Sequence, residues 1–136
     1  MNGAILAGLQ ILIVEDEYYL ADEARQILSQ MGAAILGPVP TVEQAHAVIV
    51  ATEKIDAALL DVNLRGELVF ELADTLKERS VPFAFATGYD RDVLPDRFAD
   101  RPVFGKPVRP DSLIEAFSEL VGRRATDSPV MSGPAI

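Results

Sequence analysis

The chain has 136 residues, no cysteine and a single histidine, and it carries a formal net charge of −9. This length fits one domain, and a hydrophobic content of 49% is enough to bury a core. The acidity disfavours direct binding to nucleic acid, which usually requires a basic face. The absence of cysteine excludes disulfides and thiolate metal sites, and His46 alone does not suffice for a histidine metal site.

An apolar stretch over residues 4–14 lacks the basic leader of a signal peptide and is interrupted by Gln10. It is also too short to cross a bilayer as a helix. We therefore expect a protein without membrane contact, located in the cytoplasm.

The first half of the chain alternates between apolar strands and helical patterns. Residues 9–15 are almost continuously apolar, which is typical of a central parallel strand covered on both faces. A helical pattern from Leu20 to Met31 follows, and Gly32 is expected to end it. A second strand is predicted over 33–36, ended by Gly37 and Pro38.

The same alternation continues through the middle of the chain. Thr41 is a predicted N-cap for a helix over 42–52. A third strand over 57–60 ends at Asp61, and the spacing of apolar residues predicts a helix near 67–79.

Two further units complete the pattern. A strand over 83–86 ends at Thr87, and residues 90–98 form at most a short helix because Pro95 limits it. A short strand over 103–105 precedes a last helix, which begins at Pro110 and is expected to end at Gly122.

Strands that alternate with helices predict an α/β fold with a parallel sheet, right-handed crossovers and helices on both faces. The predicted domain covers 9–122 and leaves no chain for a second one. The segment 123–136 is rich in Ser, Pro, Gly and Asp, and we expect it to be a disordered tail.

Polar side chains of the kinds that bind metal ions or phosphoryl groups follow four of the predicted strands. They are Glu15 and Asp16 after the first, Asp61 after the third, Thr87 after the fourth and Lys106 after the fifth. Because the C-terminal ends of parallel strands open on one crevice, these side chains should meet there. Carboxylates suit Mg²⁺, and a hydroxyl and an ammonium suit a phosphoryl group. Asp61 is either a third metal ligand or a nucleophile toward phosphorus.

Each of these residues also has an ordinary explanation. Acids are common before a helix, aspartates often end strands, threonine favours strands and lysine is usually a surface residue. Their joint placement at matching strand ends is what favours a site.

Four segments resemble the receiver domain of two-component response regulators. They are ILIVEDE at 11–17, ALLDVNL at 58–64, FATGY at 85–89 and FGKP at 104–107. The resemblance covers 9–122 and implies a (βα)5 flavodoxin-like, doubly wound parallel sheet with strand order 2-1-3-4-5.

The resemblance also implies roles for the strand-end residues. Asp61 resembles the phosphoacceptor, and Glu15, Asp16 and Asp61 resemble the Mg²⁺ ligands, completed by the backbone carbonyl of Asn63. Thr87 resembles the hydroxyl that contacts the phosphoryl group, and Lys106 the lysine that pairs with it. A cis bond between Lys106 and Pro107 is implied as well.

A receiver would take the phosphoryl group from a phosphohistidine of a histidine kinase or phosphotransferase and catalyse its own phosphorylation and dephosphorylation. Without an output domain, it would signal by binding a downstream protein. We expect the phosphodonor to dock over Tyr18, Tyr19 and Leu20, with Val108 and Arg109 at the rim, unless the two tyrosines are ordinary half-buried aromatics.

The sequence departs from the family in places. Val103 stands where the family often has the Tyr or Phe of its rotamer switch, and Phe104 should point to the opposite side of the strand. The PFAFATGY run at 82–89 resembles a subgroup of mostly stand-alone receivers linked to bacterial stress signalling.

Three other functions compete with a phosphorylated receiver. A pseudo-receiver would bind partners without phosphorylation, and Val103 supports it. An Asp-nucleophile phosphohydrolase usually needs a second acid where this chain has Asn63. A flavodoxin-like cofactor carrier would need a phosphate-binding loop after the first strand, where EDEYY is acidic.

Overall fold

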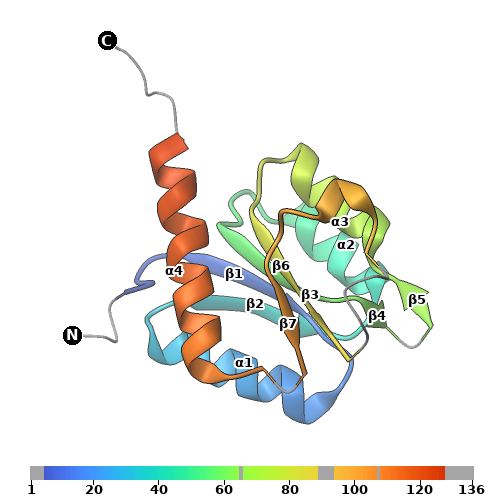
Figure 1. Ribbon diagram of the computed structural model, residues 1–136, viewed down its shortest axis with the longest axis horizontal. Coiled ribbons are helices and arrows are strands. Elements are labelled where there is room, and N and C mark those ends of the chain that lie inside the picture. Colours follow the sequence, from blue (N-terminus) through green and yellow to red (C-terminus); the bar gives the residue numbers. More distant parts are fainter. Residues whose placement is uncertain (1–4, 65, 89–93, 107, 128–136) are drawn as a thin grey trace.

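The computed structural model describes residues 5–64, 66–88, 94–106 and 108–127. It is a three-layer α/β fold whose central parallel sheet has the order β2-β1-β3-β6-β7 (Figure 1). The sheet strands are β1 (Gln10–Val14), β2 (Ala34–Val39), β3 (Ala57–Asp61), β6 (Phe83–Thr87) and β7 (Val103–Gly105). The helices are α1 (Tyr18–Gln30), α2 (Val42–Ala51), α3 (Phe70–Glu78), the 3-10 turn η3 (Asp96–Phe98) and α4 (Pro110–Asp127).

Numbered along the chain without the small hairpin, the five strands have the order 2-1-3-4-5. The predicted flavodoxin-like α/β fold is therefore confirmed. Every residue of β3 and β6 is buried, as expected for central parallel strands covered on both faces.

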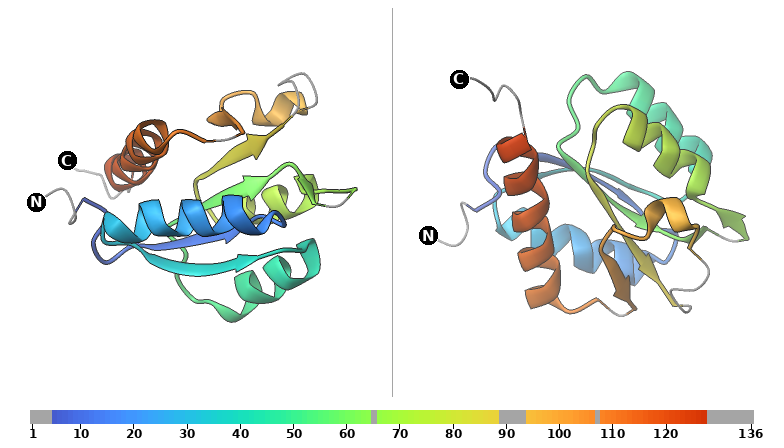
Figure 2. Two further views of the ribbon diagram at one scale, coloured as in Figure 1. Left: turned by 90° about the horizontal axis from the view of Figure 1, so that it is seen from below. Right: turned by 45° about the horizontal axis from the view of Figure 1, so that its top comes forward.

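Each face of the sheet has its own apolar core. Alternate residues of β3 point to opposite faces, so Ala58 and Leu60 pack toward α2 and α3, whereas Ala57 and Leu59 pack toward α1 and α4. Figure 2 shows these two helix layers on either side of the sheet. The layers leave the C-terminal ends of the strands as the edge where loops gather.

Several local predictions are confirmed. The Thr41 hydroxyl accepts a hydrogen bond from the Gln44 amide at 3.0 Å, which caps α2. Gly32 has a φ of +100° just after α1, the left-handed conformation that ends a helix.

Other boundaries were predicted wrongly. The second strand does not end at Gly37 but continues to Val39, because Gly37 takes a φ of +96° within it. The third helix begins only at Phe70, since residues before it form a hairpin of β4 (Asn63–Leu64) and β5 (Glu67–Leu68). The last helix runs to Asp127 rather than ending at Gly122.

The ends of the domain also differ from expectation. Leu6 is fully buried and its amide donates to the Met31 carbonyl at 2.7 Å, so packing begins before residue 9. Residues 123–127 belong to α4. Residues 128–136 lie outside the described residues, and their disorder stays a prediction.

The stretch 89–100 holds a single 3-10 turn, η3, within its described part. Residues 89–93, where the predicted short helix would begin, lie outside the described residues. Among the described segments, none of the helices combines the length and apolar character needed to span a membrane.

Candidate functional site

The four strand ends that carry polar residues lie next to each other in the sheet. Val14 pairs with Leu60 across β1 and β3, Asp61 with Ala86 across β3 and β6, and Thr87 with Gly105 across β6 and β7. The structure therefore brings the predicted residues together at one edge of the sheet.

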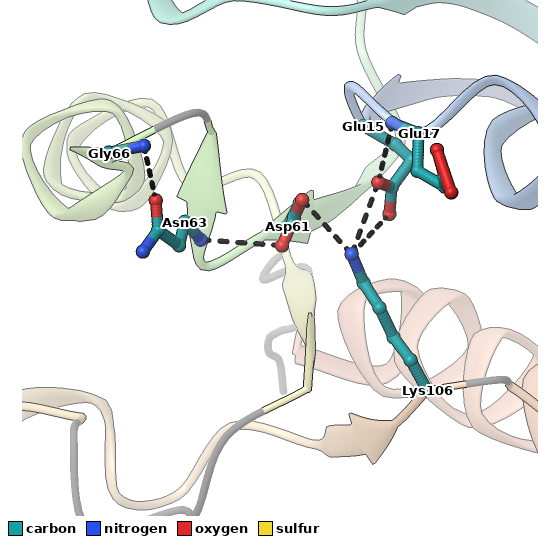
Figure 3. Close-up of polar contacts among 6 residues, drawn as sticks. All are labelled: Glu15, Glu17, Asp61, Asn63, Gly66 and Lys106. Atoms are coloured by element: carbon teal, nitrogen blue, oxygen red, sulfur yellow. Dashed lines mark hydrogen bonds and ion pairs between the residues drawn. The ribbon is translucent and has the colours of Figure 1, made fainter.

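Lys106 links two of the carboxylates directly. Its Nζ lies 3.0 and 3.1 Å from the two Glu15 carboxylate oxygens and 3.0 Å from Asp61 Oδ2 (Figure 3). Its backbone amide donates to the Thr87 carbonyl at 3.1 Å, which continues the β6–β7 pairing one residue beyond β7. The side chain is only 18% exposed, so the ion pairs are stronger than those of a surface lysine.

Asp61 is nearly buried, at 4% exposure, and each of its oxygens has a donor. Oδ2 accepts from Lys106, and Oδ1 accepts from the Asn63 backbone amide at 3.3 Å. Burial and the negative charge of Glu15 raise the pKa of Asp61 to about 7, although Lys106 opposes this and Asp16 adds to it.

Burial acts to lower the pKa of Lys106, but hydrogen bonds and charge attraction from Glu15 and Asp61 outweigh it. The pKa of Lys106 is therefore above its ordinary value, and the amine is a cation at neutral pH. The crevice holds more buried negative charge than one ammonium can neutralise, which favours a further cation.

The acid cluster fits a hard divalent cation. Glu15, Asp16 and Asp61 each offer a carboxylate oxygen, and these atoms lie within 4.8 Å of one another. An all-oxygen set of this size, open to water through the half-buried Asp16, matches the donors that Mg²⁺ takes. The fourth predicted ligand, the Asn63 carbonyl, stays a prediction.

Thr87 ends β6 and is 3% exposed. Its carbonyl accepts from Lys106, and it directly follows Ala86, the partner of Asp61 across the sheet. Thr87 therefore lies at the same edge of the sheet as Asp61, and its predicted contact with a phosphoryl group stays a prediction.

Two supporting contacts escaped sequence reasoning. The Glu17 amide donates to Glu15 Oε2 at 3.0 Å, which holds that carboxylate over the start of α1. The Asn63 side chain accepts from the Gly66 amide at 2.7 Å inside the hairpin. An Asn followed three residues later by Gly is a turn signal that could have indicated the second contact.

Val103 and Phe104 pack against opposite faces of the sheet, as predicted. On the Val103 side, Phe98 lies in an aromatic cluster, with ring centroids 6.0 Å from Phe70, 5.7 Å from Phe83 and 5.4 Å from Phe85. These rings fill the core on the face where the family's switch aromatic would stand.

Tyr18 and Tyr19 are 71% and 79% exposed, so the alternative of half-buried aromatics was wrong. Beside them, Leu20 and Val108 line a shallow groove that reaches Glu15 and Lys106. The Lys106–Pro107 bond lies outside the described residues, so its predicted cis geometry stays a prediction.

Comparison with known proteins agrees with this geometry. The solution structure of SdrG from Sphingomonas melonis Fr1 is 43% identical, covers 83% of this chain and 96% of its own, and superimposes with a TM-score of 0.74. A response regulator receiver domain protein (CheY-like) from Methanospirillum hungatei JF-1 is 27% identical, with coverage of 88% and 98% and a TM-score of 0.75. The chain belongs to the response regulator receiver family.

Sequence comparison gives the same family through longer proteins. The sensory transduction protein LytT from Bacillus anthracis is 35% identical over 89 residues, which is 63% of this chain. The match covers 36% of LytT, so this receiver spans about a third of the curated relatives it matches. No protein-family model matches the sequence.

Proposed function

We propose that this receiver accepts a phosphoryl group on Asp61 from the phosphohistidine of a histidine kinase or phosphotransferase. The observation that carries the proposal is the Lys106 ammonium, held 3.0 Å from Asp61 Oδ2 and beside a cluster of three acids. A buried carboxylate with a fixed cation and a metal-binding set is what phosphoryl transfer to aspartate requires.

In the transfer step, an Asp61 oxygen attacks phosphorus in line with the phosphohistidine nitrogen. The O–P bond forms as the N–P bond breaks, and the electron pair of the N–P bond returns to the imidazole, which solvent then protonates. Lys106 stabilises charge on the transferring phosphoryl oxygens. Bound Mg²⁺ would supply further charge neutralisation, held by Glu15, Asp16, Asp61 and the Asn63 carbonyl.

The product is an acyl phosphate, which water hydrolyses to regenerate the Asp61 carboxylate and release inorganic phosphate. While it lasts, the Thr87 hydroxyl contacts the phosphoryl group and draws β6 with it. This shifts the population of two surface states near β6 and η3, which a downstream protein distinguishes.

The phosphodonor docks over the start of α1. The groove at Leu20 and Val108 reaches Glu15 and Lys106, and the exposed Tyr18 and Tyr19 directly precede Leu20 in α1, so a phosphohistidine bound there can reach Asp61. Replacing Leu20 with Glu should slow phosphotransfer from the donor protein but leave the reaction with acetyl phosphate unchanged. Equal transfer from the donor protein to both forms would place the docking surface elsewhere.

The proposed signalling context comes from the receiver subgroup that the PFAFATGY run resembles. The PFAFATGY run supports a stand-alone receiver of bacterial stress signalling that acts in the cytoplasm through protein contacts. A pseudo-receiver that binds partners without phosphorylation is the second candidate, favoured by Val103 in place of the switch aromatic.

The experiment that separates the two uses acetyl phosphate and Mg²⁺ with intact-mass spectrometry. We expect a gain of one phosphoryl group that is stable in acid and labile in base. The gain should disappear in Asp61→Asn and persist in Asp56→Asn, a matched change of the other buried aspartate beside β3. A chain that gains no phosphoryl group would favour the pseudo-receiver.

A further inference from the structure

We propose that Asn63 is a positioning residue that acts through the hairpin. Its side chain closes the β4–β5 turn and thereby fixes its own backbone amide against Asp61, without touching the transferring group. The inference rests on the proposed phosphorylation of Asp61 and adds the device that aims this carboxylate.

Among the described residues, the Asn63 amide and Lys106 each donate to the Asp61 carboxylate. Lys106 Nζ holds Oδ2 at 3.0 Å, whereas the Asn63 amide holds Oδ1 at 3.3 Å. The second bond is slightly longer than a usual N–H···O bond, so it is the weaker of the two. The direction of the carboxylate therefore depends on how firmly residue 63 is held.

The Asn63 side chain is committed to the turn. Its Oδ1 accepts from the Gly66 amide at 2.7 Å, and Figure 3 shows the side chain directed toward Gly66 and away from the Asp61 carboxylate. Gly66 has a φ of +90°, a conformation that glycine adopts without strain. The side-chain carboxamide of Asn63 thus stabilises the turn, whereas its backbone amide donates to Asp61.

The base of the hairpin is fixed by the core. The Val62 amide donates to Ala86 on β6 at 3.0 Å, the Val69 amide donates to Val62 at 3.1 Å, and Val62, Leu64 and Val69 are buried. These contacts hold the two ends of the hairpin against the sheet that carries Asp61.

The tip of the hairpin has far less support. Glu67 and Leu68 are exposed, and only the pairs Asn63↔Leu68 and Leu64↔Glu67 join the two strands (Figure 1). A two-stranded ribbon of this length is marginal in water. The bond between Asn63 and Gly66 therefore adds to the few described contacts that hold the Asn63 peptide in register with Asp61.

Loss of this bond should slow phosphorylation by loosening the nucleophile. When the Asn63 amide is mobile, the Asp61 carboxylate spends less time aligned for in-line attack. We expect this to lower the maximal rate of phosphorylation about tenfold. The Michaelis constant for acetyl phosphate should change little, because Lys106 and the acids remain in place.

Three variants of Asn63 distinguish positioning from direct contact. Asn63→Asp keeps an oxygen acceptor of the same reach, Asn63→Gln keeps the amide but is too long to close the turn, and Asn63→Ala keeps neither. With the maximal rate measured at pH 9, where Asp61 is ionised, we expect the Gln and Ala variants to lose about tenfold and Asn63→Asp to stay faster than both. A Gln variant as fast as the Asp variant, or faster, would overturn the proposal.

Amide hydrogen exchange at residue 63 gives a readout that needs no phosphorylation. The residue 63 amide should exchange slowly in wild type and Asn63→Asp, and at least tenfold faster in Asn63→Gln and Asn63→Ala. Equal exchange in all four proteins would overturn the positioning role. If exchange follows this pattern but no protein gains a phosphoryl group, the hairpin argument stands and the proposed phosphorylation fails.

Discussion

An aspartate and a lysine form an ion pair at each end of β3, and the two pairs differ in almost every physical respect. Asp56, just before the strand, is 7% exposed and lies 3.9 Å from Lys54 Nζ, whose side chain is 70% exposed. Asp61, at the end of the strand, is 4% exposed and lies 3.0 Å from Lys106 Nζ, whose side chain is 18% exposed. Burial of the aspartate alone therefore does not identify the functional end.

The partners explain the difference. Asp56 Oδ2 accepts from the Gln10 amide at 2.8 Å, and the Asp56 amide donates to the Gln10 carbonyl at 2.8 Å, so this residue joins β1 to β3. Asp61 instead shares its lysine with Glu15 and faces a second acid, Asp16. One end of the strand is satisfied within the protein, whereas the other holds excess negative charge that a cation or phosphoryl chemistry can use.

The largest expected effect comes from removing the buried lysine. Lys106→Met leaves Glu15 and Asp61 without their shared cation and removes charge stabilisation from the transition state. We expect phosphorylation by acetyl phosphate to slow about 100-fold or more, followed as mass gain over time. A rate within threefold of wild type would show that the ion pair is structural, as at the Asp56 end.

The next effect is on stability at the opposite end. Asp56→Ala leaves the half-buried Gln10 amide without its acceptor, so the free energy of unfolding should fall by about 1–3 kcal/mol in urea titrations. The phosphorylation rate of the folded protein should not change. A slower reaction at unchanged stability would mean that Asp56 contributes to the site across the sheet.

The pH dependence of stability sharpens the comparison. An unfolded aspartate titrates near a pKa of about 3.9, whereas the pKa of Asp61 in the fold is raised to about 7. The folded protein therefore binds the extra proton between these values, and the stability that this proton contributes is complete below about pH 4 and lost as pH rises through about 7.

Without Mg²⁺, the free energy of unfolding of wild type should accordingly fall relative to Asp61→Asn as pH rises from about 4 to about 7. Urea titrations of both proteins across this range in a metal chelator measure the difference. If the free energies of unfolding of the two proteins change in parallel with pH, the carboxylates at this end of β3 do not raise the pKa of Asp61. Added Mg²⁺ should reduce the difference, because the ion stabilises the ionised carboxylates.

The smallest effect is expected at the exposed lysine. Lys54→Met removes a long, solvent-screened ion pair and should change the free energy of unfolding by no more than about 0.5 kcal/mol. It is the matched control for Lys106→Met and should leave the phosphorylation rate unchanged. A larger loss would mean that the Lys54–Asp56 pair contributes more than its geometry indicates.

The strand-end residues could be found from sequence because central parallel strands are continuously apolar. A carboxylate or hydroxyl at the end of such a run is easily recognised, and Asp61 and Thr87 were identified in this way, whereas Lys106 follows the short edge strand β7. The parallel topology then requires them to converge, which the register of β1, β3, β6 and β7 confirms.

The features that were not predicted from the sequence depend on small differences in local conformational free energy or on packing between distant segments. Gly122 was expected to end a helix, yet a glycine inside a helix costs only about 1 kcal/mol and α4 continues past it. The β4–β5 hairpin is too short to show strand periodicity, so its residues were assigned to the loop and helix. Leu6 lies in an irregular segment, and its burial depends on packing with α1 and α4 that no local pattern reveals.

The two aspartates beside β3 offer the most direct test. Borohydride converts an aspartyl phosphate to homoserine, so peptide mass spectrometry after treatment with acetyl phosphate and Mg²⁺ locates the modified carboxylate. We predict homoserine at position 61, with none at position 56 and none at Glu15 or Asp16. Homoserine at position 56, or modification that persists in Asp61→Asn, would contradict the assignment of this end of the sheet as the phosphorylation site.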